Sequence, residues 1–177
     1  MGSQPLAAGP GTRRGSLPFR AVNRRGEPTH DAALQRHHLL PRQLLRMDAF
    51  AKLFECISTR AIGFEDFRRN GLLLPAREEA VLRLGLPLHR GPHRDYNAVV
   101  IERVGQIEMA WSLATRRDSA RAGIEALQRL AALQQDLRAE LLAPRVDYLR
   151  LHANDPLGKG FDFSVLDDMA ERLWSAT

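Results

Sequence analysis

The chain has 177 residues, of which 44% are hydrophobic and 27% are charged. This length suits one soluble domain, and no uncharged apolar run approaches the roughly 18 residues that cross a bilayer, which excludes a membrane-spanning protein. The single cysteine, Cys56, excludes an intrachain disulfide framework and a cysteine zinc knuckle. Any bound metal must therefore be held by histidine and carboxylate. The first 20 residues lack the apolar core of a signal peptide, so we expect a cytoplasmic protein.

Positive charge is concentrated in the front half of the chain, whose overall net charge is +5. Residues 1–28 hold five arginines against one glutamate, and residues 36–94 hold eleven Lys or Arg against six Asp or Glu. Residues 95–177 are acidic, with ten basic and thirteen acidic residues. This asymmetry suits a polyanion bound on one side of the fold, and the alternative is a solvated, arginine-rich surface.

The first part of the chain predicts an arm followed by short elements. Residues 1–28 are rich in Gly, Pro, Ser and Arg, so we expect a disordered basic arm in which residues 19–22 could add an edge strand. Helical spacing of apolar residues predicts a helix over residues 43–57. Asn70-Gly71 predicts a turn, followed by a strand at residues 72–74 and a short helix that opens at Pro75, runs over residues 76–84 and closes at Gly85.

The second part predicts a helical scaffold. One apolar face runs from Tyr96 to Trp111, and a more regular stripe runs from Ile124 to Leu141. The intervening residues 116–119 suit a turn and a helix cap, so the simplest arrangement is two long antiparallel helices. A last amphipathic helix is predicted over residues 163–174. The fold class predicted for the chain is α+β and mostly helical.

Four of the six histidines form two tight groups, with Asn70 between them in the sequence. His37 and His38 are adjacent, so on a strand they point to opposite sides, and one can face a metal while the other faces water or substrate. His89 and His93 are four residues apart and can converge on one ion at about 2.0–2.1 Å. The residues alone leave open which of His37 and His38 faces the ion. If the rings lay more than about 10 Å apart, a hydrolase interpretation would fail.

Three runs of residues carry a resemblance to a known family. The runs His37-His38-Leu39-Leu40-Pro41, Asn70-Gly71-Leu72-Leu73-Leu74-Pro75 and Pro87-Leu88-His89-Arg90-Gly91-Pro92-His93-Arg94-Asp95-Tyr96-Asn97 are similar to the AHH branch of the HNH nuclease superfamily. Its fold is the ββα-metal finger. The match covers about residues 37–97, and the alanine that names the family is Arg36 here. The resemblance implies a nuclease core at residues 29–115, with the finger packed on a helical extension at residues 116–177.

The resemblance also implies roles for single residues. His38 would be the general base that takes a proton from the attacking water, and Asn70 would orient the His38 ring or the loop beneath it. His37 and His93 would hold one divalent ion, with His89 as a third ligand or as a partner of a ligand. The ion could be Mg, Mn, Zn or Ni.

The function implied is a metal-dependent endonuclease that hydrolyses phosphodiester bonds of DNA, with RNA left open. Arg36, Arg90 and Arg94 flank the histidines and would contact phosphate. The alternative is a non-catalytic helical interaction module with structural zinc or no metal. A homodimer through the C-terminal helices and an inhibitory partner protein are further expectations, and delivery as a secreted toxin stays open.

Overall fold

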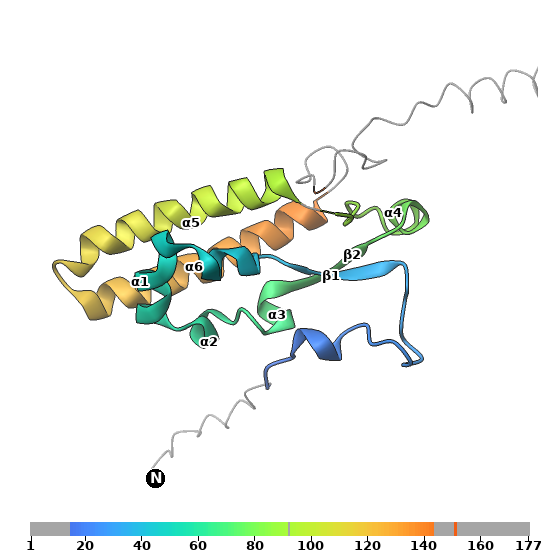
Figure 1. Ribbon diagram of the computed structural model, residues 1–177, viewed down its shortest axis with the longest axis horizontal. Coiled ribbons are helices and arrows are strands. Elements are labelled where there is room, and N and C mark those ends of the chain that lie inside the picture. Colours follow the sequence, from blue (N-terminus) through green and yellow to red (C-terminus); the bar gives the residue numbers. More distant parts are fainter. Residues whose placement is uncertain (1–14, 92, 144–150, 152–177) are drawn as a thin grey trace, which may run out of the picture.

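The structure is a computed structural model that describes residues 15–91, 93–143 and 151. Half of the predicted basic arm, residues 1–14, and the predicted helix at residues 163–174 lie outside the described residues. The division of the chain into arm, nuclease core and helical extension stays a prediction. Within the described part, residues 15–28 lie beside the small sheet rather than apart from it (Figure 1).

The described residues form two strands and several helices, most of which lie between the strands or after them (Figure 1). In chain order the elements are η1 (Phe19–Ala21), β1 (Leu34–His38), η2 (Arg42–Arg46), α1 (Asp48–Ile57), α2 (Thr59–Ile62), α3 (Phe67–Asn70), β2 (Gly71–Pro75), α4 (Glu78–Leu84), α5 (Arg94–Thr115) and α6 (Ser119–Leu142).

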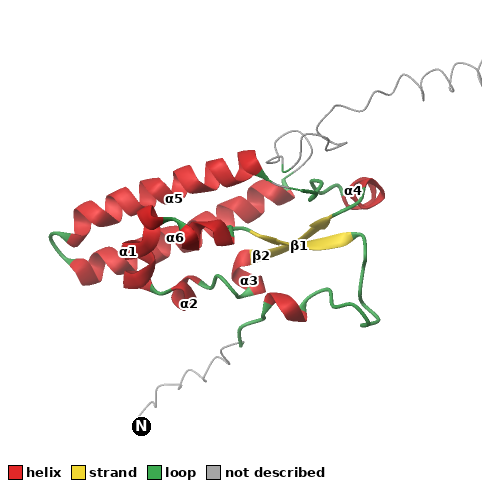
Figure 2. Cartoon of the chain, in the orientation of Figure 1, coloured by secondary structure: helices red, strands yellow, loops and turns green. Residues whose placement is uncertain are grey.

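The two strands form one antiparallel sheet (Figure 2). Leu34 lies opposite Pro75, His37 opposite Leu72, and His38 opposite Gly71. Residues 39–70, which contain η2 and α1 to α3, lie between the strands in sequence. A small sheet within a mostly helical chain confirms the predicted α+β class.

Helices α5 and α6 form the long scaffold and run side by side (Figure 1). The turn between them is fixed by Asp118, whose side chain accepts a hydrogen bond from the Arg121 backbone N–H at 2.9 Å, as expected of an N-cap residue. Their facing side chains are buried together with those of α1: Phe50, Leu53, Val100, Val104, Leu130 and Leu137. Each such side chain contributes about 1.5–3 kcal/mol when it leaves water. The predicted pair of long antiparallel helices is confirmed.

No helix among the described residues has the length and apolar character needed to cross a bilayer.

The predicted helix over residues 43–57 is interrupted. The chain forms the 3-10 turn η2, becomes extended at Met47 (φ −93°, ψ 117°), and begins α1 at Asp48. The break lets Leu44 and Phe50 both reach the core, where they are buried. The apolar spacing was therefore produced by two short elements rather than one helix.

Three further local predictions were wrong. Residues 19–21 form the turn η1 instead of an edge strand, because Pro18 pairs with Asp66 in a single bridge and the chain bends there. Asn70-Gly71 joins the end of α3 directly to the start of β2 instead of forming the predicted turn. Ile124 is 59% exposed, because Ala122 and Ala126 face the core at that end of α6.

Candidate metal centre and catalytic groove

The structure brings three of the predicted histidines together. His37, His89 and His93 each offer one ring nitrogen, and these three nitrogens lie within 4.8 Å of one another. The ring centroids are separated by 4.9 Å for His37 and His89, 5.7 Å for His37 and His93, and 4.3 Å for His89 and His93. Metal–nitrogen bonds measure about 2.0–2.1 Å, so small side-chain rotations bring all three nitrogens onto one ion.

Backbone structure explains how residues from three segments meet. His37 lies near the end of β1, and the His89 backbone N–H donates to the Pro75 carbonyl at 2.6 Å, where β2 ends. Gly91 then turns the chain with φ 76°, a conformation that glycine adopts without a Cβ clash. His93 follows as the N-cap residue of α5. His89 and His93 thus converge across a turn and not along one helical face.

Hydrogen bonds fix which nitrogen of each ring is free. His89 Nδ1 lies 3.2 Å from Gln35 Oε1, and His93 Nδ1 lies 3.0 Å from the Leu151 carbonyl oxygen. Since these oxygens can only accept, both Nδ1 atoms carry the hydrogen and donate it, which leaves the lone pair on Nε2. His37 Nε2 is buried and has no hydrogen-bond partner among the described residues. The unpartnered Nε2 of His37 lies beside two rings whose Nε2 lone pairs are available to a ligand, and this arrangement fits a divalent cation.

Burial keeps His37 and His89 neutral. The His37 side chain is only 4% exposed, and desolvation, followed by repulsion from His89 and His93, lowers the pKa of His37 to about 2. Desolvation and then the His93 ring lower the pKa of His89 to about 4. A neutral imidazole is the form that binds metal, so His37 and His89 need no deprotonation near neutral pH.

Tyr96 of α5 supports the cluster from the core side. Its ring lies 4.8 Å from the His37 ring in an edge-on arrangement, and its hydroxyl donates to the Leu39 carbonyl oxygen at 2.7 Å. Tyr96 is fully buried, and burial raises the pKa of its hydroxyl far above the ordinary value. The residue therefore remains a hydrogen-bond donor and fixes the chain directly after His38.

His38 points away from this cluster into an arginine-lined cavity. Its ring stacks on Phe19 with centroids 3.7 Å apart and an interplanar angle of 4°. The cavity measures about 540 Å³, and its charged lining residues are Arg20, Arg36, Arg42 and Glu65. Alternation along β1 explains the separation, because Gln35 and His37 share one face of the strand while Arg36 and His38 share the other.

The surroundings of His38 favour its neutral form. Burial is the main cause of its lowered pKa, the Glu65 carboxylate opposes the shift, and the Arg42 and Arg36 guanidinium groups add to it. His38 Nε2 is buried without a hydrogen-bond partner among the described residues. The ring is thus an unprotonated base with a free nitrogen, next to groups that attract phosphate.

Asn70 is fully buried beneath His38 and contacts the loop, not the ring. Its Oδ1 accepts from the Leu40 N–H at 2.7 Å and from Gln134 Nε2 at 3.2 Å. Its Nδ2 donates to the carbonyls of Leu40 and Phe64, both at 3.1 Å. Its own carbonyl accepts from the Leu39 N–H at 2.8 Å. Asn70 therefore holds the backbone that follows His38 through every hydrogen-bonding group of its side chain.

The predicted phosphate-binding arginines occupy different places. Arg36 lines the cavity that contains His38, and its Nη1 donates to the Phe19 carbonyl at 2.9 Å. Arg90 and Arg94 are exposed near the histidine cluster and do not line the cavity that contains His38. Arg36 is thus the one of the three that shares a site with His38.

Sequence reasoning missed residues that orient or surround the site. Phe19 lay in the predicted arm, and nothing local marked it as the partner of His38. Gln35 carries a signal in hindsight, since it lies two residues before His37 on the same strand face. Gln134 is also identifiable, because it is a polar side chain buried in the apolar stripe of α6. Leu151 gives no sequence signal, because its backbone carbonyl makes the contact.

Comparison with known proteins agrees with this arrangement. Residues 18–137 match the model of AHH, described as a nuclease family of the HNH/ENDO VII superfamily with conserved AHH. Searches of curated proteins and of solved structures gave no significant match. The match spans both histidine groups, β1, β2 and most of α5 and α6. The chain therefore belongs to the AHH family of HNH/ENDO VII nucleases, a family of phosphodiester hydrolases that act on nucleic acid.

Proposed function

We propose that the chain is a metal-dependent endonuclease that cuts DNA with His38 as the general base. One observation carries this proposal: the side chains of two adjacent histidines of β1 lie in two different surroundings. His37 joins His89 and His93, whereas His38 lines a cavity with three arginines. A ligand set and a free base on opposite faces of one strand are the two parts that metal-assisted hydrolysis requires.

His37, His89 and His93 would hold one divalent cation. The unpartnered His37 Nε2 and the Nδ1 hydrogen bonds of the other two rings support this assignment. When bound, the cation supplies Lewis acidity that stabilises negative charge on phosphate and leaving-group oxygens. The histidine donors would suit Zn or Ni, whereas Mg and Mn prefer oxygen ligands.

His38 would take the proton from the water that attacks phosphorus. Its lowered pKa keeps the ring neutral near neutral pH, and Nε2 is free to accept. The proton moves to His38 as the new P–O bond forms, and the bond to the leaving oxygen breaks. Arg36 and Arg42 would neutralise the phosphate charge in the same cavity. Asn70 would act as a positioning residue, because it holds the loop after His38 without touching the ring.

The test compares the two neighbouring histidines. His38→Ala should lower plasmid nicking by about 100-fold to 10,000-fold, the usual contribution of a general base, while it keeps the stoichiometry and affinity of bound Zn²⁺. His37→Ala should lose both nicking and tight Zn²⁺ binding, since it removes a ligand. Nicking is scored on supercoiled DNA with Mg²⁺, Mn²⁺, Zn²⁺ or Ni²⁺ in turn, and an RNA substrate is assayed in parallel. Circular dichroism establishes that each variant folds.

Two results would overturn the proposal. If wild type and His38→Ala nick equally with every cation, His38 is not the base. If chelator unfolds the protein and no cation supports nicking, a structural zinc in a non-catalytic module explains the histidines better. Association through the C-terminal helices, an inhibitory partner and a cytoplasmic location stay predictions.

A further inference from the structure

A second cavity lies along the N-terminal segment and borders the cavity beside His38. This second cavity measures about 710 Å³ and shares Arg20 and Arg36 with the first. It adds Arg24 and Arg25. We name the arginines of the two cavities the arginine track: Arg20, Arg24, Arg25, Arg36 and Arg42. The track extends from the candidate base toward the residues that precede β1.

Carboxylates only partly neutralise the arginine track. Glu27 lies 3.6 Å from Arg24, and Glu65 lies 3.6 Å from Arg42, in pairs that are largely exposed. Such exposed pairs contribute at most about 1 kcal/mol and are readily exchanged for another anion. Arg20 and Arg25 have no ion-pair partner among the residues that the structure describes. The track therefore carries positive charge that is available to a ligand.

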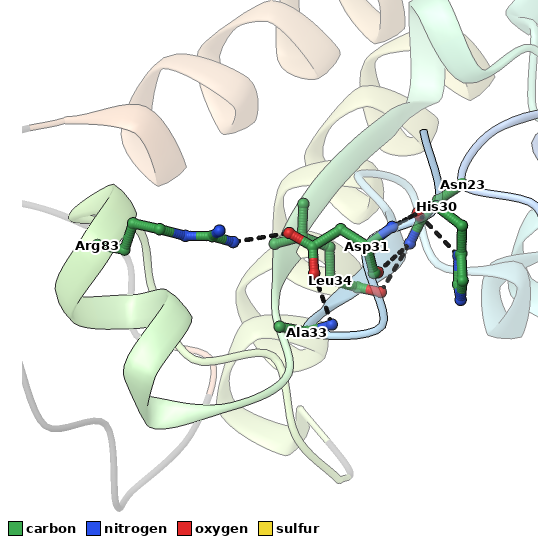
Figure 3. Close-up of polar contacts among 6 residues, drawn as sticks. All are labelled: Asn23, His30, Asp31, Ala33, Leu34 and Arg83. Atoms are coloured by element: carbon green, nitrogen blue, oxygen red, sulfur yellow. Dashed lines mark hydrogen bonds and ion pairs between the residues drawn. The ribbon is translucent and has the colours of Figure 1, made fainter. Parts of the chain in front are cut away.

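The wall of the second cavity is held in a fixed shape (Figure 3). Asn23 adopts a left-handed conformation with φ 49°, and its Nδ2 donates to the carbonyls of Asp31 and Leu34 at 2.8 and 3.0 Å. Its Oδ1 accepts from the Asp31 N–H at 2.8 Å and lies 3.1 Å from His30 Nδ1. Asp31 in turn pairs with Arg83 of α4 at 2.6 Å. These bonds fix the loop before a ligand arrives, which lowers the entropy cost of binding.

The chemistry of the two cavities favours a phosphate backbone over nucleobases. Phe19 is the aromatic residue other than histidine in their lining, and its ring is already stacked on His38 and packed edge-on against Phe67. His30, whose Nδ1 lies 3.1 Å from Asn23 Oδ1, is the one other aromatic ring in the described lining of the second cavity, which also holds Arg20, Arg24, Arg25 and Arg36. Guanidinium groups pair with phosphate in a bidentate manner. The ligand that fits these cavities is a polyanion that is recognised through its charge.

Arg36 connects the two cavities to the motif of the family. The family description names a conserved AHH, and this chain has Arg36 where that alanine would stand. Arg36 lines both cavities, and its Nη1 donates to the Phe19 carbonyl at 2.9 Å. This position thus adds a charge beside His38 that an alanine lacks.

We propose that the arginine track binds the phosphate backbone of the nucleic acid that His38 cuts, on the side of β1 opposite the histidine cluster. The inference rests on the proposed function and adds to it the surface that holds the substrate. Because contacts to phosphate carry no sequence information, binding through the track is independent of sequence and strongly dependent on salt.

The test uses two matched double variants of the full chain in a His38→Ala background, so that the probe is not cut. Arg20→Gln/Arg25→Gln removes two arginines of the track that have no ion-pair partner among the described residues, and Arg116→Gln/Arg117→Gln removes two exposed arginines at the α5–α6 turn. Fluorescence anisotropy measures binding of a labelled DNA duplex and a labelled single strand across a salt series. The track variant should bind about 30-fold more weakly near 0.1 M salt, with a salt slope smaller by about 1.4–1.8, while the control stays within about threefold of its parent.

Each outcome decides one question. Equal losses in both variants, or no loss in either, would overturn the track, since binding would then follow overall charge or another surface. Selective loss in the track variant, in a chain that nicks no DNA with any cation, would leave the binding surface standing and reject the nuclease mechanism. If nicking depends on His38 but the track variant does not bind DNA selectively more weakly, the nuclease mechanism stands and the binding surface is rejected. Thermal melting monitored by circular dichroism verifies that both variants fold.

Discussion

Replacing Asn70 by alanine tests whether this residue acts on the site through the loop or directly on the reaction. The side chain is fully buried and uses both amide atoms to hold Leu40 and Phe64, with Gln134 as a further partner. Removal leaves the Leu40 N–H, the Gln134 side-chain N–H and the carbonyl oxygens of Leu40 and Phe64 without this partner. If Asn70 is a positioning residue, stability and activity must fall together.

The size of the effect follows from these bonds. A buried donor left unsatisfied costs about 1–3 kcal/mol, and carbonyls with a second lone pair cost less. A small cavity adds to the loss, so Asn70→Ala should lower the free energy of unfolding by about 3–5 kcal/mol. That is a large share of the roughly 5–15 kcal/mol that stabilises a typical domain. Gln134→Leu removes one hydrogen bond of 3.2 Å and leaves Asn70 bound to Leu40, so it should cost only about 1 kcal/mol.

Urea unfolding followed by circular dichroism measures both values, and the nicking assay is run on the same preparations at a temperature where each variant is folded. We expect the order wild type, Gln134→Leu, Asn70→Ala in both stability and nicking. The reasoning would be refuted if Asn70→Ala lost less than about 1 kcal/mol of stability yet abolished nicking. Asn70 would then contact substrate or the His38 ring during the reaction.

Three other predictions address the histidines. In metal-free protein the unfolded His37 takes up a proton below its ordinary pKa of 6.5, whereas the folded ring, with a pKa of about 2, does not. The free energy of unfolding should therefore fall as pH drops below about 6.5, by up to about 1.4 kcal/mol per pH unit, and a urea series showing no such slope would contradict the burial of His37. Phe19→Ala exposes His38 and should raise its pKa, which moves the acid limb of the pH–rate profile to higher pH. Phe19→Leu should move the limb less, and an unmoved limb in both variants would show that the stack does not control the base. Gln35→Ala removes the acceptor for His89 Nδ1 and should weaken Zn²⁺ binding by about tenfold in a chelator competition, whereas Gln43→Ala should not; equal affinities for all three proteins would contradict an orienting role.

The helical scaffold could be predicted because its signal is local and repeated. The stripe of α6 recurs at helical spacing through Leu130, Leu133, Leu137 and Leu141, so one misplaced residue such as Ile124 does not change the assignment. The helix expected at residues 43–57 failed for the opposite reason. Two short elements produced one apolar pattern, and the extended Met47 between them gives no signal of its own.

The candidate site was predictable where motif and strand alternation act together. Adjacency of His37 and His38 on a strand already requires opposite faces, and the histidine cluster forms on one of them. The partners of these residues depend on tertiary structure. Phe19 reaches His38 because residues 15–28 fold back along Asp66 and Phe67, a contact that composition alone argues against.

The alternation along β1 has a consequence for how this chain tolerates change. Because neighbouring side chains fall on opposite sides, a one-residue shift in the register of β1 would turn His37 toward the face of the arginine-lined cavity and His38 toward the face of the histidine cluster. A point substitution can weaken the metal-ligand set or the candidate base separately, whereas a one-residue shift in register would disable both. Both the histidine cluster and the position of His38 thus depend on the register of the five residues of β1.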